Sequence, residues 1–459
     1  MKRLLVGLAL VSGCGDDDCC KVTMDAAVPD SPGPTQDANL SLTEVALVPA
    51  TVNRDVDLLF IIDDSPSMLD KQANLKSSFP NLVSVLATVQ GGLPNIHLGV
   101  ITTDMGSKGA DDTVAGPGIG SGPGSCSGSG KDGVLQTFGA PVTGNYLSDL
   151  DDGTGNRVKN YTGTLEAAFS AMASAGAGGC GFEQPLAALR RSFENATNAG
   201  FIRSTARLAI VLLSDEDDCS MSHSTLMGSD TATLGPLQSF RCTRFGVQCD
   251  VAGTTTDEMN ALGGKDACHS NEQSAYVADL ARYSSFLSTL KADPREVIFG
   301  AIVGATSPFS VEPRSPPGGG TAIPALAHSC SYTGAAGTEV ADPPARIAQL
   351  AGNLRRGSID SVCNGNLAGV MTSMGQRIKS LVGDPCLVQS IAMPATCEAV
   401  DVRGSTQTVI PACSATTTTD CFTVVQDATL CPAGQQLKLD VVRSSPPTKD
   451  TWTSLRCAI

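Results

Sequence analysis

The sequence predicts an α/β fold with a doubly wound, mostly parallel sheet. Three observations predict it. Residues 56–62, 96–103, 207–213 and 297–303 are largely apolar runs, typical of parallel strands that helices cover on both faces. Segments with apolar residues at helical spacing lie between these runs. Two of the runs end in acidic and hydroxyl residues, at the strand end where open α/β sheets place their ligands.

The elements follow one another along the chain with three long interruptions. Helices are expected at residues 69–89, 164–175, 185–191, 274–290, 344–350 and 367–381. The interruptions, at residues 105–160, 216–272 and 304–343, are rich in glycine, serine, proline or cysteine. We therefore interpret residues 50–385 as one domain with three insertions.

The first acidic motif follows the strand at 56–62 and reads Asp63-Asp64-Ser65-Pro66-Ser67. One carboxylate and two hydroxyls at alternate positions of a tight loop can all turn toward one point. These are hard oxygen donors, which suit Mg²⁺, Mn²⁺ or Ca²⁺. The alternative is a turn that only ends the strand. A phosphatase of the haloacid dehalogenase type would need a second aspartate where Ser65 stands.

Two further motifs lie downstream. Ser214 and Asp215 open a run of acids, 214–218, directly after the strand at 207–213. Asp217 and Asp218 are expected to be solvated loop acids, and Asp64 is expected to face solvent or cap its loop. A glycine-rich loop at 178–185 contains Glu183, and Pro185 suits the first turn of the helix that follows.

In their order along the chain, these three motifs resemble those of the von Willebrand factor type A (VWA) family. Asp63, Ser65 and Ser67 match the family's Asp-x-Ser-x-Ser motif, and Asp215 matches its third motif. The resemblance implies a Rossmann-like VWA domain with a metal ion-dependent adhesion site (MIDAS). It further implies that five residues hold one divalent cation, Mg²⁺ first, with Ca²⁺ or Mn²⁺ as alternatives: Asp63, Ser65, Ser67, Glu183 and Asp215.

Glu183 departs from the family pattern, which has a neutral threonine at this position. Asp63, Glu183 and Asp215 together supply three negative charges to a divalent ion. We expect such an ion to be held more tightly and to attract an external carboxylate less, and Ca²⁺ tolerates this many carboxylates. The alternative for Glu183 is an ordinary glutamate at a helix N-terminus, where the helix dipole favours it.

The N-terminus is interpreted as a lipoprotein signal peptide, residues 1–13. Lys2 and Arg3 precede a short apolar stretch, and Val11-Ser12-Gly13-Cys14 resembles a lipoprotein cleavage site at which Cys14 is lipidated. The alternative is an ordinary secretory signal. Residues 14–45 then form a flexible tether rich in aspartate and proline. Gly15 after the lipidated cysteine favours the outer membrane of the cell envelope.

The cysteines predict disulfide bonds. The chain has 17, and 16 remain when Cys14 is set aside. An even number in an exported chain is typical of disulfide pairing. Residues 386–459 carry six of them between Thr/Val-rich segments, which predicts a small Cys-rich β module. The alternative is an extended tail tied onto the main domain.

The net charge and the absence of catalytic motifs argue against two classes of function, nucleic-acid binding and catalysis. The net charge is −15, and the sequence has no basic cluster of the kind that binds nucleic acid. It shows no pairing of a nucleophile with a base, so no catalytic residue and no enzyme is predicted. We expect a membrane-anchored, metal-dependent adhesion module that holds a protein or extracellular-matrix ligand through an acidic residue. The alternatives are a structural envelope protein with a stabilising metal and, third, a metal-dependent hydrolase.

Overall fold

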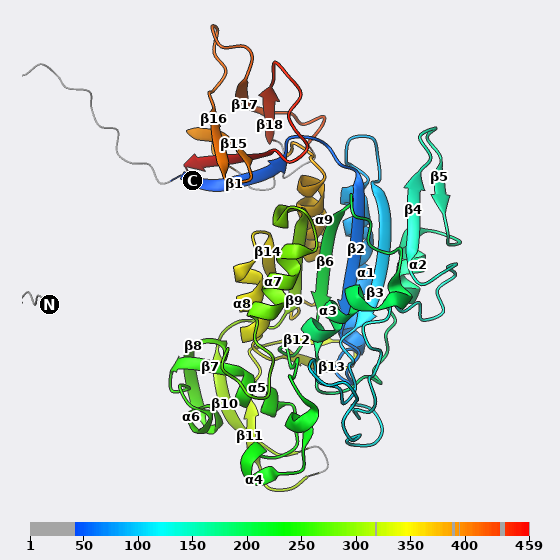
Figure 1. Cartoon of the computed structure of the whole chain (residues 1–459), viewed down its shortest axis with the longest axis vertical. Helices are drawn as coiled ribbons and strands as arrows, with labels where there is room; N and C mark the ends of the chain where they lie inside the picture. The colour runs from blue at the N-terminus through cyan, green and yellow to red at the C-terminus, as the bar shows by residue number, and fades with distance from the viewer. Residues whose placement is uncertain (1–41, 317–318, 388–390, 394, 432–436, 459) are drawn as a thin grey trace, which may run out of the picture. The chain divides into compact units, whose positions relative to one another are not determined.

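The central sheet has seven strands in the order β14-β9-β6-β2-β3-β4-β5 (Figure 1). The computed structural model describes residues 42–316, 319–387, 391–393, 395–431 and 437–458. In chain order the strands of this sheet are Asp55–Ile62 (β2), Asn95–Thr102 (β3), Leu147–Asp151 (β4), Arg157–Lys159 (β5), Arg207–Leu213 (β6), Val297–Val303 (β9) and Gly357–Ser361 (β14). All pairs from β14 to β3 are parallel, whereas β4 is antiparallel to β3 and β5 is antiparallel to β4. The α/β prediction is thus confirmed as a mixed α/β structure with a mixed sheet, while the VWA assignment stays a prediction.

Helices pack on both faces of this sheet. Along β2, Leu58 and Phe60 lie in one hydrophobic cluster, and Leu59 and Ile61 lie in the other. The first cluster holds residues of Leu69–Leu86 (α1), Leu165–Met172 (α2) and Ala368–Leu381 (α9). The second holds residues of Pro185–Glu194 (α3), Ala281–Thr289 (α7) and Ala345–Asn353 (α8). Burial on both faces explains why these strands are apolar throughout.

The sheet changes its direction of winding between β2 and β6. From β2 the chain passes to its neighbour β3, whereas from β6 it continues to β9 and β14 on the other side. In open α/β sheets, ligands bind at the carboxyl ends of strands at such a switch point. Asp63 directly follows β2, and Ser214 and Asp215 directly follow β6.

The insertions contribute to sheets rather than forming loops only. The first provides β4 and β5 of the central sheet. The other two are joined in a four-stranded sheet of order β11-β10-β8-β7, because β8 pairs with β10. These insertions contain Thr231–Leu234 (α4), Phe240–Gly246 (α5), Val247–Val251 (β7), Thr256–Asn260 (α6), Gly263–Ser270 (β8), Phe309–Arg314 (β10), Ile323–Leu326 (β11), Cys330–Gly334 (β12) and Gly337–Ala341 (β13).

The C-terminal region is rich in strands, as expected, but it also includes the start of the described chain. Its four-stranded sheet has the order β1-β19-β15-β16, and β17 pairs with β18. The strands are Leu42–Pro49 (β1), Cys397–Arg403 (β15), Thr406–Ile410 (β16), Cys421–Gln426 (β17), Leu437–Val442 (β18) and Trp452–Ala458 (β19). Residues 42–45, which we expected in the tether, lie in β1. Val45 explains this difference, since it is buried in the same cluster as Leu455 of β19.

Seven disulfides confirm that the cysteines pair. They are Cys126–Cys180, Cys219–Cys242, Cys249–Cys268, Cys330–Cys363, Cys386–Cys431, Cys397–Cys457 and Cys413–Cys421. The remaining cysteines, including the expected lipidation site Cys14, lie outside the described residues, as does the expected signal peptide. In the described part of the chain, the helices are too short or too polar to cross a bilayer.

Candidate metal site

The loop after β2 folds around the carboxylate of Asp63. The backbone N–H of Asp63 donates to the carbonyl of Leu213 at 3.0 Å, so that the loop continues the pairing of β2 with β6. Asp63 Oδ1 accepts from the N–H of Ser65 at 2.8 Å, and Oδ2 accepts from the hydroxyl of Ser214 at 2.7 Å. The hydroxyl oxygens of Ser65 and Ser67 are 3.2 Å apart. The loop therefore presents one buried carboxylate and two neighbouring hydroxyls.

The glycine-rich loop lies directly against this loop. The N–H of Gly179 donates to the carbonyl of Asp64 at 2.7 Å, and a Cβ on Gly179 would lie 2.4 Å from Asp64 Oδ1. Glycine is required there because any side chain would push the two loops apart. Further along, the carbonyl of Glu183 accepts from the N–H of Cys219 at 2.8 Å. The loop thus holds the buried Glu183 between the segments that follow β2 and β6.

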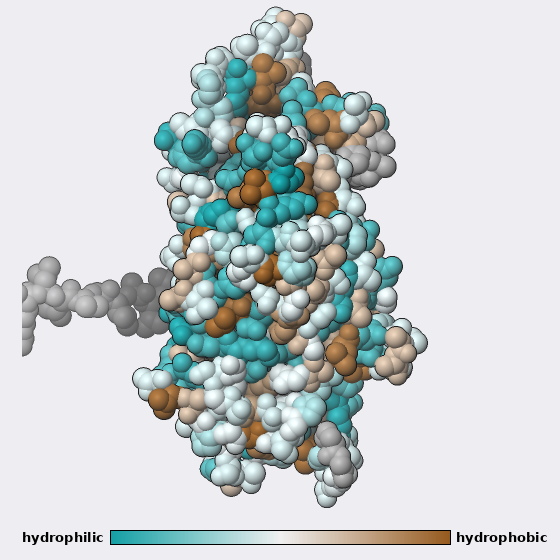
Figure 2. Space-filling view, turned by 90° about the vertical axis from the view of Figure 1, so that its right-hand side faces the viewer, coloured by the Kyte–Doolittle hydropathy of each residue, from teal (hydrophilic) through white to brown (hydrophobic). Residues whose placement is uncertain are grey.

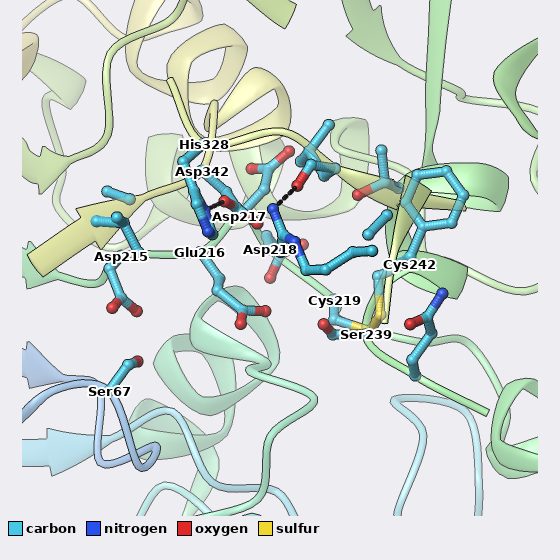
Figure 3. A pocket seen from close by; sticks show the side chains of 18 of the residues that line it. Ser67, Asp215, Glu216, Asp217, Asp218, Cys219, Ser239, Cys242, His328 and Asp342 are labelled. Atoms are coloured by element: carbon cyan, nitrogen blue, oxygen red, sulfur yellow. Dashed lines mark hydrogen bonds and ion pairs between the residues drawn. A yellow bond between two sulfur atoms is a disulfide. The ribbon is translucent and has the colours of Figure 1, made fainter. Parts of the chain in front are cut away.

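Asp215 and Glu216 extend into a pocket of about 320 Å³ that Ser67 and Asp342 also line. Figure 3 shows the carboxylates of Asp215 and Glu216 directed toward the side of the pocket on which Ser67 lies. Asp342, from the insertion at 304–343, donates its backbone N–H to the carbonyl of Asp215 at 2.8 Å. We call Asp63, Glu183, Asp215, Glu216 and Asp342 the acid cluster.

Burial and mutual repulsion raise the pKa values of Asp63, Glu183 and Glu216 in the acid cluster. Burial and the charge of Asp215 raise the pKa of Asp63 to about 7. Burial, with the charges of Asp342 and Asp215, raises the pKa of Glu216 to about 8. Burial and the charge of Glu216 raise the pKa of Glu183 well above its usual value. These carboxylates therefore lack cationic neighbours sufficient to stabilise their charged forms.

Lys71 of α1 provides a positive charge beside Asp215. Its Nζ lies 3.0 Å from Asp215 Oδ2 and 2.8 Å from Glu339 Oε2. Burial raises the pKa of Asp215, while Lys71 and the Ser67 hydroxyl counteract that effect. One oxygen of Asp215 is therefore held by an ammonium group of the protein itself.

The oxygen atoms of the site suit a hard divalent cation, although they are not gathered as a ligand set. Within the described residues, Glu183 Oε1 and Asp215 Oδ1 are buried and have no hydrogen-bond partner. Such atoms are costly to bury unless something satisfies them. However, no group of three or more His, Cys, Asp or Glu residues in the described part of the chain is arranged to hold a metal.

Each of the five residues predicted as ligands therefore lies at this switch point, and their role as ligands stays a prediction. Asp63, Ser65, Glu183 and Asp215 are buried, and Ser67 is exposed at the pocket. Asp63 and Asp215 are neighbours, close enough for their charges to interact.

Three aspartates differ from expectation because they serve the structure. Asp64 is buried and forms an ion pair with Lys131 of the first insertion. Asp217 accepts from the N–H groups of Arg346 (2.9 Å) and Ile347 (3.1 Å) at the start of α8, as carboxylates favour at helix N-termini. Asp218 forms a fully buried ion pair with Arg346 at 3.1 Å. The expectation that Asp217 and Asp218 are solvated was wrong.

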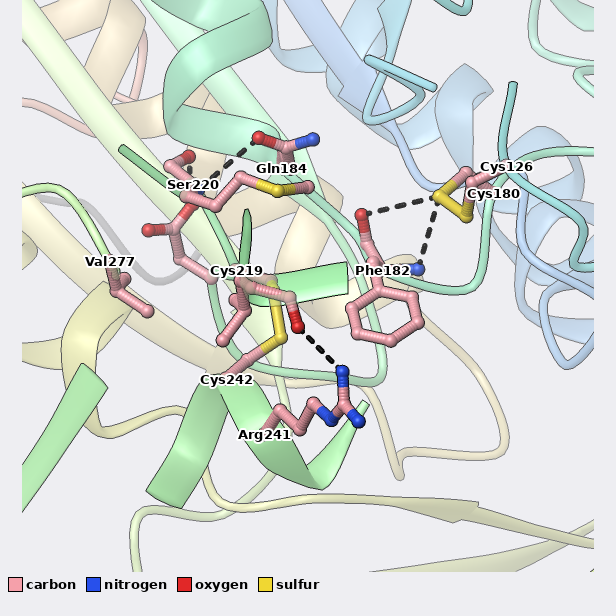
Figure 4. Close-up of a disulfide and its surroundings, with 12 residues drawn as sticks. Cys126, Cys180, Phe182, Gln184, Cys219, Ser220, Arg241, Cys242 and Val277 are labelled. Atoms are coloured by element: carbon pink, nitrogen blue, oxygen red, sulfur yellow. Dashed lines mark hydrogen bonds between the residues drawn. A yellow bond between two sulfur atoms is a disulfide. The ribbon is translucent and has the colours of Figure 1, made fainter. Parts of the chain in front are cut away.

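Two disulfides frame the site (Figure 4). Cys126–Cys180 joins the first insertion to the glycine-rich loop, three residues before Glu183. Cys219–Cys242 joins the segment after Asp215 to α5. The loop that carries Glu183 and the segment after Asp215 are therefore each tied by a disulfide.

Sequence reasoning did not identify Lys71, Glu216, Glu339 or Asp342 as part of the site. Glu216 had a local signal, since it directly follows Asp215. Glu339 and Asp342 had none, because their insertion reaches the site only through tertiary packing.

Comparisons with known proteins add little to this geometry. No family model matches the sequence, and no curated protein matches it. Among solved structures, the pilus adhesin SpaC of Lactobacillus rhamnosus GG is 10% identical, with a TM-score of 0.31 over 93% of this chain and 45% of its own. The pilus adhesin RrgA of Streptococcus pneumoniae is 10% identical, with a TM-score of 0.23 over 91% and 58%. Human COPII-coat protein Sec24c is 9% identical, with a TM-score of 0.30 over 88% and 39%.

These scores are too low to assign a fold or a function. The chain also spans less than half the length of SpaC and less than two thirds of RrgA.

Proposed function

We propose that the protein is a membrane-anchored, metal-dependent binding module of the bacterial cell envelope, with a MIDAS-type site and no catalytic residue. The observation that carries this proposal is that two of the buried, unpartnered carboxylate oxygens in the described chain, Glu183 Oε1 and Asp215 Oδ1, lie at the switch point of the sheet. They lie where ligands bind in sheets of this kind, and a pocket opens beside them.

The chemistry of the site favours Mg²⁺, with Ca²⁺ or Mn²⁺ as alternatives. Asp63, Ser65, Ser67, Glu183 and Asp215 would hold the ion, and all of them offer hard oxygen atoms. The bound ion would supply a positive charge and an open coordination position. An acidic side chain of a protein or matrix partner would take that position, entering through the pocket that Ser67 and Asp215 line.

The placement in the envelope is supported by two features. Seven disulfides are typical of a protein in an oxidising compartment outside the cytoplasm. The expected lipid on Cys14 would anchor the chain to a membrane, with the outer membrane as the proposed location. On the face that Figure 2 shows, hydrophobic residues occur in small groups between polar ones, which suits a protein in contact with water.

Cation binding is tested by two matched substitutions on β2 and its loop. Asp63→Asn removes the central charge of the site, whereas Asp55→Asn changes the same residue type at the other end of the strand. We expect calorimetry to show one Mg²⁺ or Mn²⁺ bound by wild type and by Asp55→Asn, and binding weaker by about a hundredfold or more in Asp63→Asn. Equal metal affinity in both variants would show that Asp63 is not a ligand.

Partner capture is tested separately with a defined probe. A peptide with one glutamate should bind the metal-loaded protein, and the matched glutamine peptide should not. We expect a chelator to abolish binding of the glutamate peptide, while circular dichroism shows that the fold is intact. If the metal instead raises the melting temperature and neither peptide binds, the site is purely structural and the adhesion role is wrong.

The effect of Glu183 is tested by Glu183→Thr, which restores the neutral residue of the resembling family. We expect this variant to bind the metal more weakly, because one carboxylate ligand is lost. Metal binding as tight as in wild type, or tighter, would show that Glu183 is not a ligand.

One observation favours hydrolysis as a second candidate function. His328 Nδ1 lies 2.6 Å from Asp342 Oδ1, and both residues line the pocket beside Asp215. A histidine positioned by a carboxylate is a common general base. Turnover of a phosphoester or peptide that is lost in both Asp63→Ala and His328→Ala would establish this activity, whereas no turnover by wild type would reject it.

A further inference from the structure

We infer that a pocket at the amino end of β14 binds a phosphate group through three arginines. The pocket has a volume of about 310 Å³ and is lined by residues of β1, of the start of β14 and of the last turns of α9. Because β14, β9, β6 and β2 are parallel, it lies at the opposite end of the sheet from Asp63 and is independent of the proposed metal site. Its charged and hydroxyl residues are Glu44, Arg355, Arg356, Arg377 and Ser380.

Arg356, directly before β14, forms no ion pair within the described residues. Its guanidinium group donates to the carbonyl of Leu47 and lies 4.9 Å from the centre of the Trp452 ring. Its Nε is buried and has no hydrogen-bond partner in the described chain. Burial lowers the pKa of Arg356 to about 10; the charge of Glu44 opposes this shift, and three neighbouring arginines add to it, namely Arg207, Arg355 and Arg295. An added anion would therefore stabilise the charged form of Arg356.

Arg377 and Ser380 offer further donors on α9. They are three residues apart in the helix, so they lie on the same side of it, and both line the pocket. In the described part of the chain, neither the guanidinium of Arg377 nor the hydroxyl of Ser380 has a hydrogen-bond or ion-pair partner. The charge of Arg377 acts on Asp360 of β14, but the two form no ion pair. Both side chains can therefore turn toward a ligand without breaking a described contact.

Arg355 is the most exposed of the three arginines. Its Nη2 donates to Glu44 Oε2 at 2.6 Å, and its side chain is 53% exposed. The same oxygen of Glu44 accepts from the hydroxyl of Ser454 at 2.6 Å. Exposed ion pairs contribute little to stability. Arg355 can therefore exchange Glu44 for an anionic ligand at low cost, because Ser454 still donates to Glu44.

The charges around the pocket leave a positive excess. Three arginines line it, and the acids that act on them are Glu44 and Asp360. The other two arginines that act on Arg356 have acids of their own, in the pairs Arg207–Glu296 and Arg295–Asp293. This local excess occurs in a chain whose net charge is −15. It favours an anion over a cation as the ligand of this pocket.

The donors suit the oxygen atoms of a phosphate group. Guanidinium groups present N–H bonds in a planar fork that matches phosphate geometry, which the point charge of an ammonium group does not. The apolar residues Val45, Leu47 and Ile298 also line the pocket, and they suit the carbon skeleton of a phosphate ester. A soluble phosphate compound and the headgroup of a membrane phospholipid share this chemistry.

The test is calorimetric titration of the full mature chain at low ionic strength, with divalent ions removed so that no phosphate binds through a metal. The probes are inorganic phosphate, glycerol phosphate and dihexanoyl phosphatidylglycerol, a phospholipid whose chains are short enough to dissolve. Arg377→Gln removes one charge, and Ser380→Ala is a second variant in case Arg377→Gln does not fold. Arg190→Gln is the matched control, since Arg190 is another partly buried helix arginine, paired with Glu194 on α3.

We expect wild type and Arg190→Gln to bind at least one probe with equal affinity. Arg377→Gln should bind that probe about tenfold or more weakly, because a charge-assisted hydrogen bond is lost, and Ser380→Ala about threefold or more weakly. Tighter binding of the phospholipid would identify a membrane headgroup as the ligand. Tighter binding of inorganic phosphate or glycerol phosphate would identify a soluble phosphate compound.

Two results would overturn the inference. The first is that wild type binds none of the three probes. The second is that a probe binds as tightly to Arg377→Gln as to wild type, or to Ser380→Ala where Arg377→Gln does not fold, because the phosphate would then lie elsewhere. Neither result bears on the metal site, which Asp63→Asn tests.

Discussion

The two ends of the central sheet gather buried charges of opposite sign, and these charges have different partners. At the carboxyl ends of β2 and β6 lies the acid cluster, in which burial and repulsion raise the pKa values of Asp63, Glu183 and Glu216. At the amino ends of β6, β9 and β14 lies what we call the Trp452 cluster. In it the guanidinium groups of Arg207, Arg295 and Arg356 lie 5.1, 5.5 and 4.9 Å from the ring of Trp452, the sole tryptophan of the chain.

The Trp452 cluster contains counter-ions for two of its three arginines. Glu296 pairs with Arg207, and Asp293 pairs with Arg295 at 2.7 Å and accepts from Trp452 Nε1 at 2.9 Å. Arg356 donates to the carbonyl of Leu47 in β1. The acid cluster, by contrast, has Lys71 as the cation that directly contacts Asp215.

The two clusters therefore differ in whether the protein itself supplies the charges that balance them. Cations over an aromatic ring, with acids beside them, stabilise a junction between two sheets. Acids without enough cations destabilise the fold unless a ligand neutralises them. The predictions below test this difference, beginning with the largest effect.

Trp452→Ala should destabilise the protein by about 3 to 5 kcal/mol, because it removes a fully buried large side chain and exposes three guanidinium groups to a cavity. Denaturant unfolding monitored by far-ultraviolet circular dichroism measures the loss. Mn²⁺ affinity of the folded variant should stay unchanged. A parallel loss of Mn²⁺ binding would show that the two ends of the sheet are coupled.

In chelator, stability should fall as the pH rises from about 4 to about 8. The folded protein keeps the protons of Asp63 (pKa about 7) and Glu216 (pKa about 8), whereas the unfolded chain has released them near pH 4. The folded state thus binds more protons in this range, which lowers the free energy of unfolding by up to about 1.4 kcal/mol per pH unit for each acid. Melting temperatures at pH 5, 6, 7 and 8 measure the slope, and a stability that increases with pH would contradict it.

Asp63→Asn should leave metal-free stability at pH 8 unchanged or increase it by about 1 kcal/mol. The substitution removes a charge that repels Asp215 and keeps a carbonyl oxygen that can accept from Ser65 or Ser214. The same variant should show a shallower pH slope. A loss of several kcal/mol at pH 8 would mean that the charge of Asp63 stabilises the fold by itself.

Trp452→Phe should cost about 1 kcal/mol. It keeps an aromatic ring against the three arginines and removes the hydrogen bond from Nε1 to Asp293. The difference in free energy of unfolding between Trp452→Phe and Trp452→Ala measures the contribution of the aromatic ring. The difference between wild type and Trp452→Phe measures that of the hydrogen bond. If Trp452→Phe destabilised the protein as much as Trp452→Ala, the hydrogen bond to Asp293 would account for most of the contribution of Trp452.

Local sequence signals were sufficient for four strands of the central sheet and for the first members of the site. Apolar runs identified β2, β3, β6 and β9, because burial on both faces leaves no alternating polar positions. Asp63 and Asp215 were found because each directly follows such a run. The helix expected at 274–290 is shorter, and α7 comprises only Ala281–Thr289. Before α7, the chain instead passes along the second insertion, where Val277 and Met221 form a bridge.

The sequence by itself determined the residues of β2, β3, β6 and β9, because an apolar run of strand length is a local property. It did not predict β4, β5 and β14 of the same sheet. It also determined that the cysteines pair, although not which cysteine pairs with which. Only the tertiary structure decided the charge balance of the site. Lys71 and Glu339 are 268 residues apart and meet over Asp215, and interactions between residues so distant in the chain leave no local pattern to read.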